Sequence, residues 1–161
     1  MNRIGDSLDC TGTNKEIIVA FSKCAVEFVV IGGLAVAWYC SARQADDMDL
    51  LVSPSPENSE RIFQALSSLE LTGFNQSSFS KFGLRVSFKG RYYSDLLTPR
   101  KDGPTYLDVA ESAVKGKIFN VPAYIASARS LIQLKEIAVA SAENSKQKHL
   151  NDIECLRQYL V

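Results

Sequence analysis

The stretch that decides the fold runs Ile31-Gly-Gly-Leu-Ala-Val-Ala-Trp38 and, after a polar connection, Asp47-Met-Asp-Leu-Leu-Val52. Residues 27–31 are apolar except for the first and are typical of a short buried strand that ends at Gly32-Gly33. Residues 34–42 are rich in alanine and large apolar side chains, which indicates a buried helix, and residues 47–52 indicate a second strand. The stretch therefore predicts a strand, a glycine turn, a helix and a strand in one supersecondary unit.

Asp47 and Asp49 share one face of the second strand, with Leu51 further along, because side chains alternate with a period of two. Two neighbouring carboxylates repel each other, and partial burial enlarges that cost, so folding does not need the pair. A divalent cation removes the cost, since Mg²⁺ is held by one or two carboxylates together with substrate phosphates. The alternative is an edge strand whose acids are solvated.

Gly32 and Gly33 let backbone N–H groups approach a ligand, and the N-terminus of the helix that follows favours anions. A Gly-Gly pair alone is also what a tight strand-to-helix turn requires. Followed by a helix and an Asp-x-Asp strand, it places a phosphate cradle and a metal pair close together.

A third acid, Asp95, lies in Tyr92-Tyr-Ser-Asp-Leu-Leu97, where it shares a strand face with Tyr93 and Leu97. An acid inside so apolar a strand needs a partner. Three carboxylates on neighbouring strands suit phosphoryl chemistry with two metal ions, and Asp95 could also act as the base on an incoming hydroxyl. The alternative is an acid at the end of a strand, before the turn at Thr98-Pro99.

Two cations have candidate roles beside these acids. Lys135 falls near the centre of the apolar face of a helix that starts at Ser127 or Ser130, so it must snorkel, pair with an acid or face a polar cleft. Near a triphosphate it would clamp the phosphates. Arg43 lies just before the strand over residues 47–52, where it would contact the triphosphate or stabilise the loop. The alternative is an ordinary loop arginine.

The rest of the chain predicts one α+β (α/β) domain over residues 1–161, with a small mixed sheet. Residues 1–12 are expected to be a flexible arm, residues 13–125 the core sheet with its helices, and residues 126–161 the C-terminal helices. Further strands are expected over 84–88, 91–97 and 117–121, and helices over about 14–26, from Pro56, over 105–113, to about 141 and over 147–160.

Composition narrows the function classes. Formal net charge is zero, so no global electrostatic attraction to nucleic acid or membrane follows, and a large RNA acceptor is mildly disfavoured. The apolar stretch over residues 28–40 is too short to span a membrane and the N-terminus has no secretory pattern, so we expect a cytosolic protein. With one histidine, His149, a multi-histidine metal site is disfavoured. Three of the four cysteines, Cys24, Cys40 and Cys155, are expected to be small core residues.

The run Ile31-Gly-Gly to Asp47-Met-Asp49-Leu-Leu-Val resembles the signature of the DNA polymerase beta-type nucleotidyltransferase superfamily, with residues 34–46 as the spacer. It is most similar to small prokaryotic members, including toxin-type enzymes of abortive-infection and toxin–antitoxin systems. Later motifs match more loosely, through Asp95, Leu131-Ile-Gln-Leu-Lys135 and part of Lys148-His-Leu-Asn-Asp-Ile153. Ala45 and His149 depart from it, standing where threonine and aspartate are common.

The resemblance, which covers about residues 28–160, implies a short mixed sheet flanked by helices and a helical C-terminal part. It implies transfer of a nucleoside monophosphate from an NTP such as ATP to an acceptor hydroxyl, with one or two Mg²⁺ ions and release of pyrophosphate. Asp47, Asp49 and Asp95 would be the catalytic and metal-binding residues, and Gly32, Gly33, Arg43 and Lys135 would bind the nucleotide. The acceptor could be a protein, a tRNA end or a small molecule such as an aminoglycoside, and a homodimer or a cognate antitoxin is expected as a partner.

Two alternatives stay open at the level of sequence. One is a protein of this fold that has lost turnover and binds a nucleotide or a partner, to which Ala45 and His149 give weight. The other is an unrelated α/β domain in which the three acids are solvated surface groups.

Overall fold

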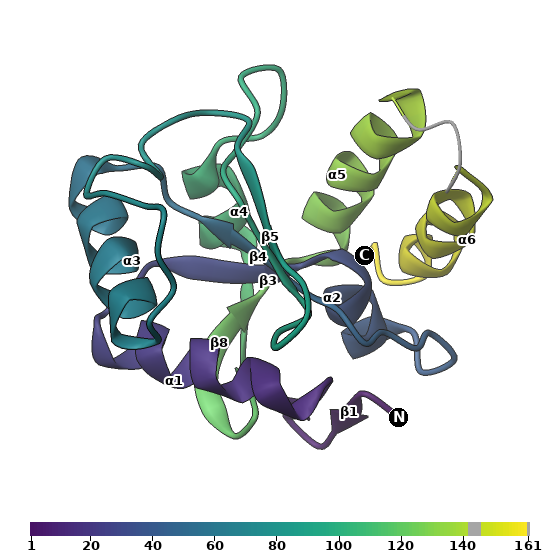
Figure 1. Ribbon diagram of the computed structural model, residues 1–161. Helices are drawn as coiled ribbons and strands as arrows, with labels where there is room; N and C mark the ends of the chain where they lie inside the picture. Colours follow the sequence, from purple (N-terminus) through teal and green to yellow (C-terminus); the bar gives the residue numbers. More distant parts are fainter. Residues whose placement is uncertain (142–145, 161) are drawn as a thin grey trace.

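The computed structural model describes residues 1–141 and 146–160, which form an eight-stranded mixed sheet with helices around it (Figure 1). The fold is therefore the expected α+β arrangement. The elements follow in the order β1 (Arg3–Ile4), β2 (Ser7–Leu8), η1 (Gly12–Asn14), α1 (Lys15–Lys23), β3 (Phe28–Ile31), α2 (Gly32–Tyr39), β4 (Met48–Val52), α3 (Pro56–Ser68), β5 (Arg85–Phe88), β6 (Ser94–Leu97), α4 (Tyr106–Ser112), β7 (Val114–Ile118), β8 (Val121–Ile125), α5 (Ala128–Ser141) and α6 (Lys146–Arg157).

The sheet has the strand order β1-β2-β7-β8-β3-β4-β6-β5. Strand β4 lies between β3, which is antiparallel to it, and β6, which is parallel. The registers place Ile31 of β3 and Asp95 of β6 directly opposite Asp49 of β4. The glycine turn after Ile31 and two of the three predicted acids therefore meet at one position in the middle of the sheet.

The alternation along β4 explains why its acid, Asp49, is tolerated. Met48, Leu50 and Val52 are fully buried on one face, whereas Asp49 is only partly buried on the other. The strand starts at Met48 rather than at the expected Asp47, so Asp47 precedes it and is exposed. Register is fixed by the three apolar side chains, because a slip of one residue would turn them away from the core.

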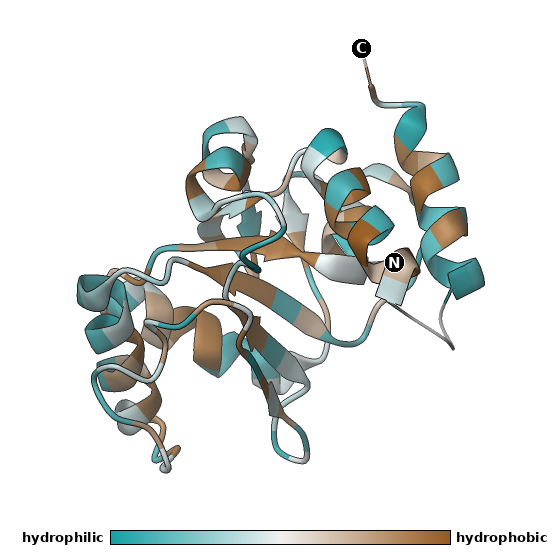
Figure 2. Ribbon diagram, turned by 90° about the horizontal axis from the view of Figure 1, so that it is seen from above, coloured by the Kyte–Doolittle hydropathy of each residue, from teal (hydrophilic) through white to brown (hydrophobic). Residues whose placement is uncertain are grey.

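The helices form two groups. In Figure 1, α1 and α3 lie on one side of the strands, and α2, α5 and α6 lie on the other. Figure 2 shows brown, apolar stretches along the central strands, whereas the helices alternate between teal and brown. Helix α3 opens at Pro56 as predicted, and the hydroxyl of Ser55 caps it by accepting from the backbone N–H of Asn58 at 3.1 Å.

The expectation of a flexible arm over residues 1–12 is wrong for the part that precedes η1. Strands β1 and β2 form a hairpin, and β2 pairs with β7 in parallel, which buries Leu8 completely. Asn2 then bonds both backbone groups of Ala45, donating at 2.7 Å and accepting at 2.9 Å. Strands of two residues carry no detectable period, so the sequence pattern could not reveal them.

The single strand expected over residues 117–121 is a hairpin of two strands, β7 and β8, instead. Its turn is Phe119-Asn120, where both residues have positive φ, +52° and +64°. Such a turn normally contains glycine. Because this one has none, the sequence pattern did not indicate a hairpin. Strand β8 matters for the site because it connects the sheet to α5.

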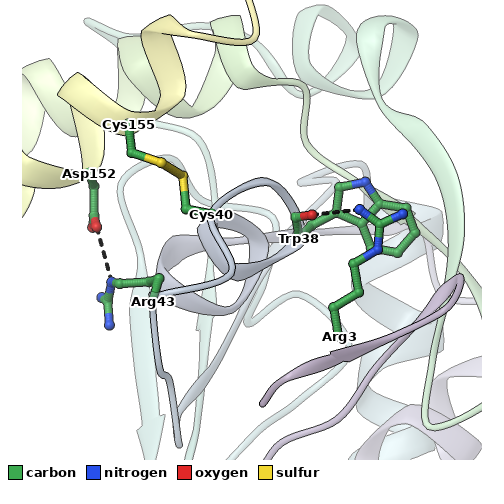
Figure 3. Close-up of a disulfide and its surroundings, with 6 residues drawn as sticks. All are labelled: Arg3, Trp38, Cys40, Arg43, Asp152 and Cys155. Carbon is green, nitrogen blue, oxygen red and sulfur yellow. Dashed lines mark hydrogen bonds and ion pairs between the residues drawn. A yellow bond between two sulfur atoms is a disulfide. The ribbon is translucent and has the colours of Figure 1, made fainter.

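The prediction that Cys40 and Cys155 are small core residues with free thiols is wrong, because the two form a disulfide (Figure 3). The bond joins the C-terminal end of α2 to α6, across 115 residues of sequence, and the two Cα atoms lie 6.4 Å apart. Apolar helical surroundings predict burial of a cysteine but give no information about a partner so distant in sequence. Cys24 is half-buried against the core and is a free thiol.

Among the described residues, no helix combines the length and the apolar character that crossing a membrane requires.

Candidate active site

Gly32 and Gly33 are glycines because two functional side chains approach the backbone there. Gly32 has φ +68°, and a Cβ at this position would collide with the carboxylate of Asp49. A Cβ on Gly33 would lie 2.6 Å from a guanidinium nitrogen of Arg43. The first turn of α2 therefore brings an acid and a cation together at its N-terminus, where free N–H groups favour anions.

Asp49 and Asp95 form the centre of the site. They lie opposite each other on adjacent parallel strands, and Asp95 is only 3% exposed. Burial, together with the negative charge of Asp95, raises the pKa of Asp49 to about 6. The two carboxylates thus repel each other in a partly dry environment, whereas the sequence pattern predicted this repulsion for Asp47 and Asp49.

Strand β5 and the turn after it supply two cations that the sequence did not reveal. Arg85 bonds Asp95 Oδ2 through Nη2 at 2.5 Å, and Lys89 Nζ lies 3.8 Å from Asp95 Oδ1 and 3.6 Å from Asp47 Oδ2. Burial by itself raises the pKa of Asp95, but the Ser87 hydroxyl, Arg85 and Lys89 outweigh it and hold that pKa below its ordinary value. The partner that Asp95 required is therefore an arginine on the neighbouring strand.

The donor set fits a hard divalent cation. Asp47, Asp49 and Asp95 offer carboxylate oxygens only, and Asp95 Oδ1 is buried with no hydrogen-bond partner among the described residues. As the side chains lie, no three acidic, histidine or cysteine groups within residues 1–141 and 146–160 converge closely enough to hold an ion together. The ammonium of Lys89 bridges Asp47 and Asp95 instead, so metal binding requires this lysine to move.

Lys135 is buried and belongs to a charged network between α5, α6 and the loop before β4. Its Nζ lies 3.1 Å from Asp152 Oδ2, and Asp152 Oδ1 accepts from Arg43 Nε at 3.0 Å. Figure 3 shows Arg43 and Asp152 pointing toward each other beside the disulfide. Asp152 thus links the two cations that the sequence singled out.

His149 completes this network on the cleft side. Burial and the charge of Lys135 lower the pKa of His149, so the ring is neutral near pH 7. Its Nδ1 lies 3.2 Å from Lys135 Nζ, where a neutral ring accepts a hydrogen bond from the ammonium. Asp152 and His149 were not among the predicted site residues, although both lie in the segment that matched the last motif only in part.

The cleft above β4 has two lobes. A polar lobe of about 320 Å³ is lined by Gly33, Arg43, Asp47 and Lys148, among others. A second lobe of about 450 Å³ is lined mostly by apolar side chains of β4, β6 and α5. Asp49, Lys135 and His149 line both lobes. All seven predicted site residues except Asp95 line one lobe or both, and Asp95 lies beside them on β6.

Comparisons of the sequence with protein-family models and with curated proteins found no match. Solved structures do match. An antigenic nucleotidyltransferase-like protein from Paracoccidioides brasiliensis is 12% identical over 91% of this chain and 77% of that chain, with a TM-score of 0.55. The antibiotic-resistance factor ANT(2'')-Ia is 15% identical over 92% of this chain and 83% of its own, with a TM-score of 0.59. The structure of ANT(2'')-Ia in complex with adenylyl-2''-tobramycin is 14% identical over 91% of this chain and 87% of that chain, with a TM-score of 0.56.

At these identities the likeness concerns the fold. The chain has a nucleotidyltransferase-like fold, as the resemblance of its motifs implied. Which chemistry this site performs must be argued from its own residues.

Proposed function

We propose that the protein is a metal-dependent nucleotidyltransferase, which transfers a nucleoside monophosphate from an NTP to an acceptor hydroxyl. The observation that carries the proposal is the register of Asp49 and Asp95 on adjacent strands, beside the glycine-rich start of α2. In the free protein Asp49 is partly buried beside the negative charge of Asp95, which raises the pKa of Asp49, and a bound metal ion would relieve that cost.

The residues divide by role. Asp47, Asp49 and Asp95 would hold Mg²⁺, which when bound neutralises charge on the phosphates and polarises the reacting phosphorus. The N-terminus of α2, Arg43 and Lys135 would bind the triphosphate, with Asp152 holding both cations in place. A fixed cation beside the leaving phosphates stabilises charge that develops in the transition state.

Asp95 lies on β6, next to the edge strand β5, and would be the base for the acceptor hydroxyl. As a base it is weakened by Arg85, which holds its pKa low. Accepting the proton of a hydroxyl at Asp95 therefore requires Arg85, whose side chain is 65% exposed, to turn toward the substrate.

A second candidate function is nucleotide or partner binding without turnover. The observation that favours it is Lys89, whose ammonium lies between Asp47 and Asp95 where an ion would be held. A permanent lysine at this place would stabilise the acids and exclude the metal.

The acceptor classes stay those that the resemblance implied: a protein, a tRNA end or a small molecule such as an aminoglycoside. ANT(2'')-Ia, whose complex contains adenylyl-2''-tobramycin, gives the small-molecule class a structural parallel.

A toxin-type role, a homodimer and a cognate antitoxin belong to this proposal as well. So does a cytoplasmic location, where NTPs are abundant, and there the Cys40–Cys155 bond would have to withstand reducing conditions.

The first test is thermal unfolding with and without Mg²⁺ and each NTP. We expect at least one nucleotide to raise the midpoint in the presence of Mg²⁺, because ligands that bind only the folded state stabilise it. The Asp47→Ala/Asp49→Ala variant should lose this rise. A rise that does not depend on Mg²⁺ supports nucleotide binding without turnover, and no rise with any nucleotide contradicts both nucleotidyl transfer and nucleotide binding.

A further inference from the structure

The two lobes of the cleft lie on opposite sides of Asp49 along β4. Asp47, Asp49 and Leu51 follow one another on the same face of the chain, since side chains alternate along a strand. Asp47 lines the polar lobe, Leu51 lines the apolar lobe, and Asp49 lines both. Leu97, which is opposite Leu51 on β6, lines the apolar lobe as well. The direction of β4 thus orders the cleft as polar lobe, central acid and apolar lobe.

The polar lobe has the groups that would bind the triphosphate. Arg43 and Lys148 line the polar lobe together with Gly33, at the N-terminus of α2. Lys148 forms no ion pair among the described residues, whereas each cation that lines the apolar lobe is already paired with an acid: Arg85 with Asp95, Arg100 with Asp102 and Lys135 with Asp152. If the protein transfers nucleotides as proposed above, the pyrophosphate leaves on this side.

The acceptor must then approach from the other side. In phosphoryl transfer the attacking and leaving oxygens lie roughly in line through the phosphorus. With the phosphorus beside Asp49 and the leaving group in the polar lobe, the attacking hydroxyl comes from the apolar lobe. The walls of that lobe, Leu51 and Leu97 on the sheet and Leu131, Leu134 and Ile137 on α5, suit an apolar body. Its volume of about 450 Å³ is that of a small-molecule site.

The charged groups that line the apolar lobe are mostly basic. Arg85, Arg100 and Lys135 line it, whereas the acids that pair with them, Asp95, Asp102 and Asp152, do not. Among the described residues, Asp49 is the acid that lines it, and the proposed function assigns Asp49 to the metal. Once Asp49 binds the metal, a cationic acceptor would meet these cations and no free carboxylate in the lobe, which costs binding energy.

We propose that the apolar lobe is the acceptor site and that it takes a neutral or anionic hydroxyl compound with an apolar or aromatic body. A polycation, including an aminoglycoside, is disfavoured there. This inference rests on the proposed function for the direction of attack and for the metal on Asp49, whereas the three cations that line the lobe are a feature of the structure.

Three matched phenols test the preference: tyrosol, which is neutral, 4-hydroxyphenylacetate, which is anionic, and tyramine, which is cationic. Each is titrated into the full chain with labelled methyl groups in the presence of Mg²⁺, and the shifts of Leu97, Leu134 and Ile137 are followed. We expect tyrosol and 4-hydroxyphenylacetate to shift these methyls with Kd values at least about tenfold below that of tyramine. Tyramine or an aminoglycoside binding as tightly as tyrosol would overturn the proposal, and so would unchanged lobe methyls with all three phenols.

A pair of variants on α5 controls for charge alone. Ala138 lines the apolar lobe and Ala140 does not, and neither belongs to the catalytic groups. Ala138→Glu should tighten tyramine about tenfold and weaken 4-hydroxyphenylacetate, whereas Ala140→Glu should change neither by more than about twofold. Equal effects of the two variants would show that the preference does not arise in the lobe.

The titrations contain no nucleotide, so their failure is distinct from failure of the proposed function. If the phenols bind as expected but no NTP raises the unfolding midpoint, the lobe is a ligand site and the assignment as acceptor site is wrong.

Discussion

Gly32 shows how one residue determines the geometry of the site. Its positive φ and its contact with Asp49 both exclude a side chain. Gly5 has a similar φ of +62°, but a Cβ at that position would meet nothing within 4 Å. Comparing Gly5 with Gly32 therefore separates the cost of the positive φ from the cost of the contact with Asp49. We expect Gly5→Ala to cost about 1–2 kcal/mol through its backbone conformation alone. Gly32→Ala should cost at least about 1 kcal/mol more, because Asp49 must move.

Urea unfolding of the two variants measures this difference directly. Equal losses for Gly5→Ala and Gly32→Ala would mean that the contact with Asp49 carries no energy. The closeness of this acid to the α2 N-terminus would then be incidental.

Asp49 makes stability depend on pH. Because its pKa is raised to about 6, the folded protein holds this proton more tightly than the unfolded chain does. The stabilisation is complete below about pH 4 and is lost as pH rises toward about 6. Asp49→Asn does not titrate, so its advantage over the parent protein should grow between about pH 4 and 6 to on the order of 2–3 kcal/mol, and stay constant above.

Chemical unfolding at a series of pH values checks this curve, in the absence of divalent cations. An advantage that shrinks as pH rises from about 4 to 6 would show that Asp49 is stabilised as a carboxylate in the free protein.

The acids could be found from sequence, whereas their partners could not. Asp47, Asp49 and Asp95 stand out because carboxylates alternate with apolar residues on strands that fold around a core. Arg85 and Lys89 lie in a charged, exposed region whose residues look like any solvated edge strand. Only the register of β5 against β6 brings them to Asp95, and register depends on side chains elsewhere in the sheet.

At the scale of elements, α6 is positioned by a disulfide and a charged network rather than by a large apolar face. The disulfide joins Cys155 to Cys40 across 115 residues of sequence. In the chain-entropy model, a crosslink of this span lowers the entropy of the unfolded chain and so stabilises the fold by about 4–5 kcal/mol. We therefore expect reductant to lower the urea midpoint markedly. Cys40→Ala/Cys155→Ala should have the lower midpoint with or without reductant.

The matched control is Cys10→Ser/Cys24→Ser, which removes the two free thiols. Its midpoint should fall with reductant as far as that of the parent protein. An unchanged midpoint of the parent protein under full reduction would contradict a structural role for the bond.

Asp152 stabilises the same helix from the side of the cleft. Asp152→Asn would leave the buried ammonium of Lys135 without its acid, and we expect a loss of about 3 kcal/mol in free energy of unfolding. Adding Lys135→Met removes the uncompensated charge and should recover most of that loss. A double-mutant cycle gives the coupling between them, and purely additive losses would contradict a direct pairing.

The elements that were predicted correctly are those with a clear period or a capping signal. Helix α3 begins at Pro56, and β4 follows its alternating pattern to within one residue. The hairpins β1–β2 and β7–β8 were missed because they consist of two-residue strands or turn without glycine. The pairing of Cys40 with Cys155 depends on how α6 returns to α2, which is a property of the tertiary fold.

At the scale of the whole molecule, the sheet order explains why the predicted site residues lie close together. The decisive stretch, residues 31–52, forms the end of β3, α2 and β4 at the centre of the sheet, and Asp95 joins it through one parallel pairing. The C-terminal helices then close the cleft with Lys135 and His149. The motif thus determined the centre of the site, and the long-range packing of α5 and α6 determined its walls.

Transfer of label from NTPs carrying ³²P at the α-phosphate to protein, tRNA and small-molecule fractions of a cell extract tests the central claim most directly. We expect Mg²⁺-dependent label in one fraction with the parent protein and none with Asp47→Ala/Asp49→Ala. Nucleotide binding by the parent protein without label in any fraction, at every NTP and with Mg²⁺ present, would contradict nucleotidyl transfer by this site.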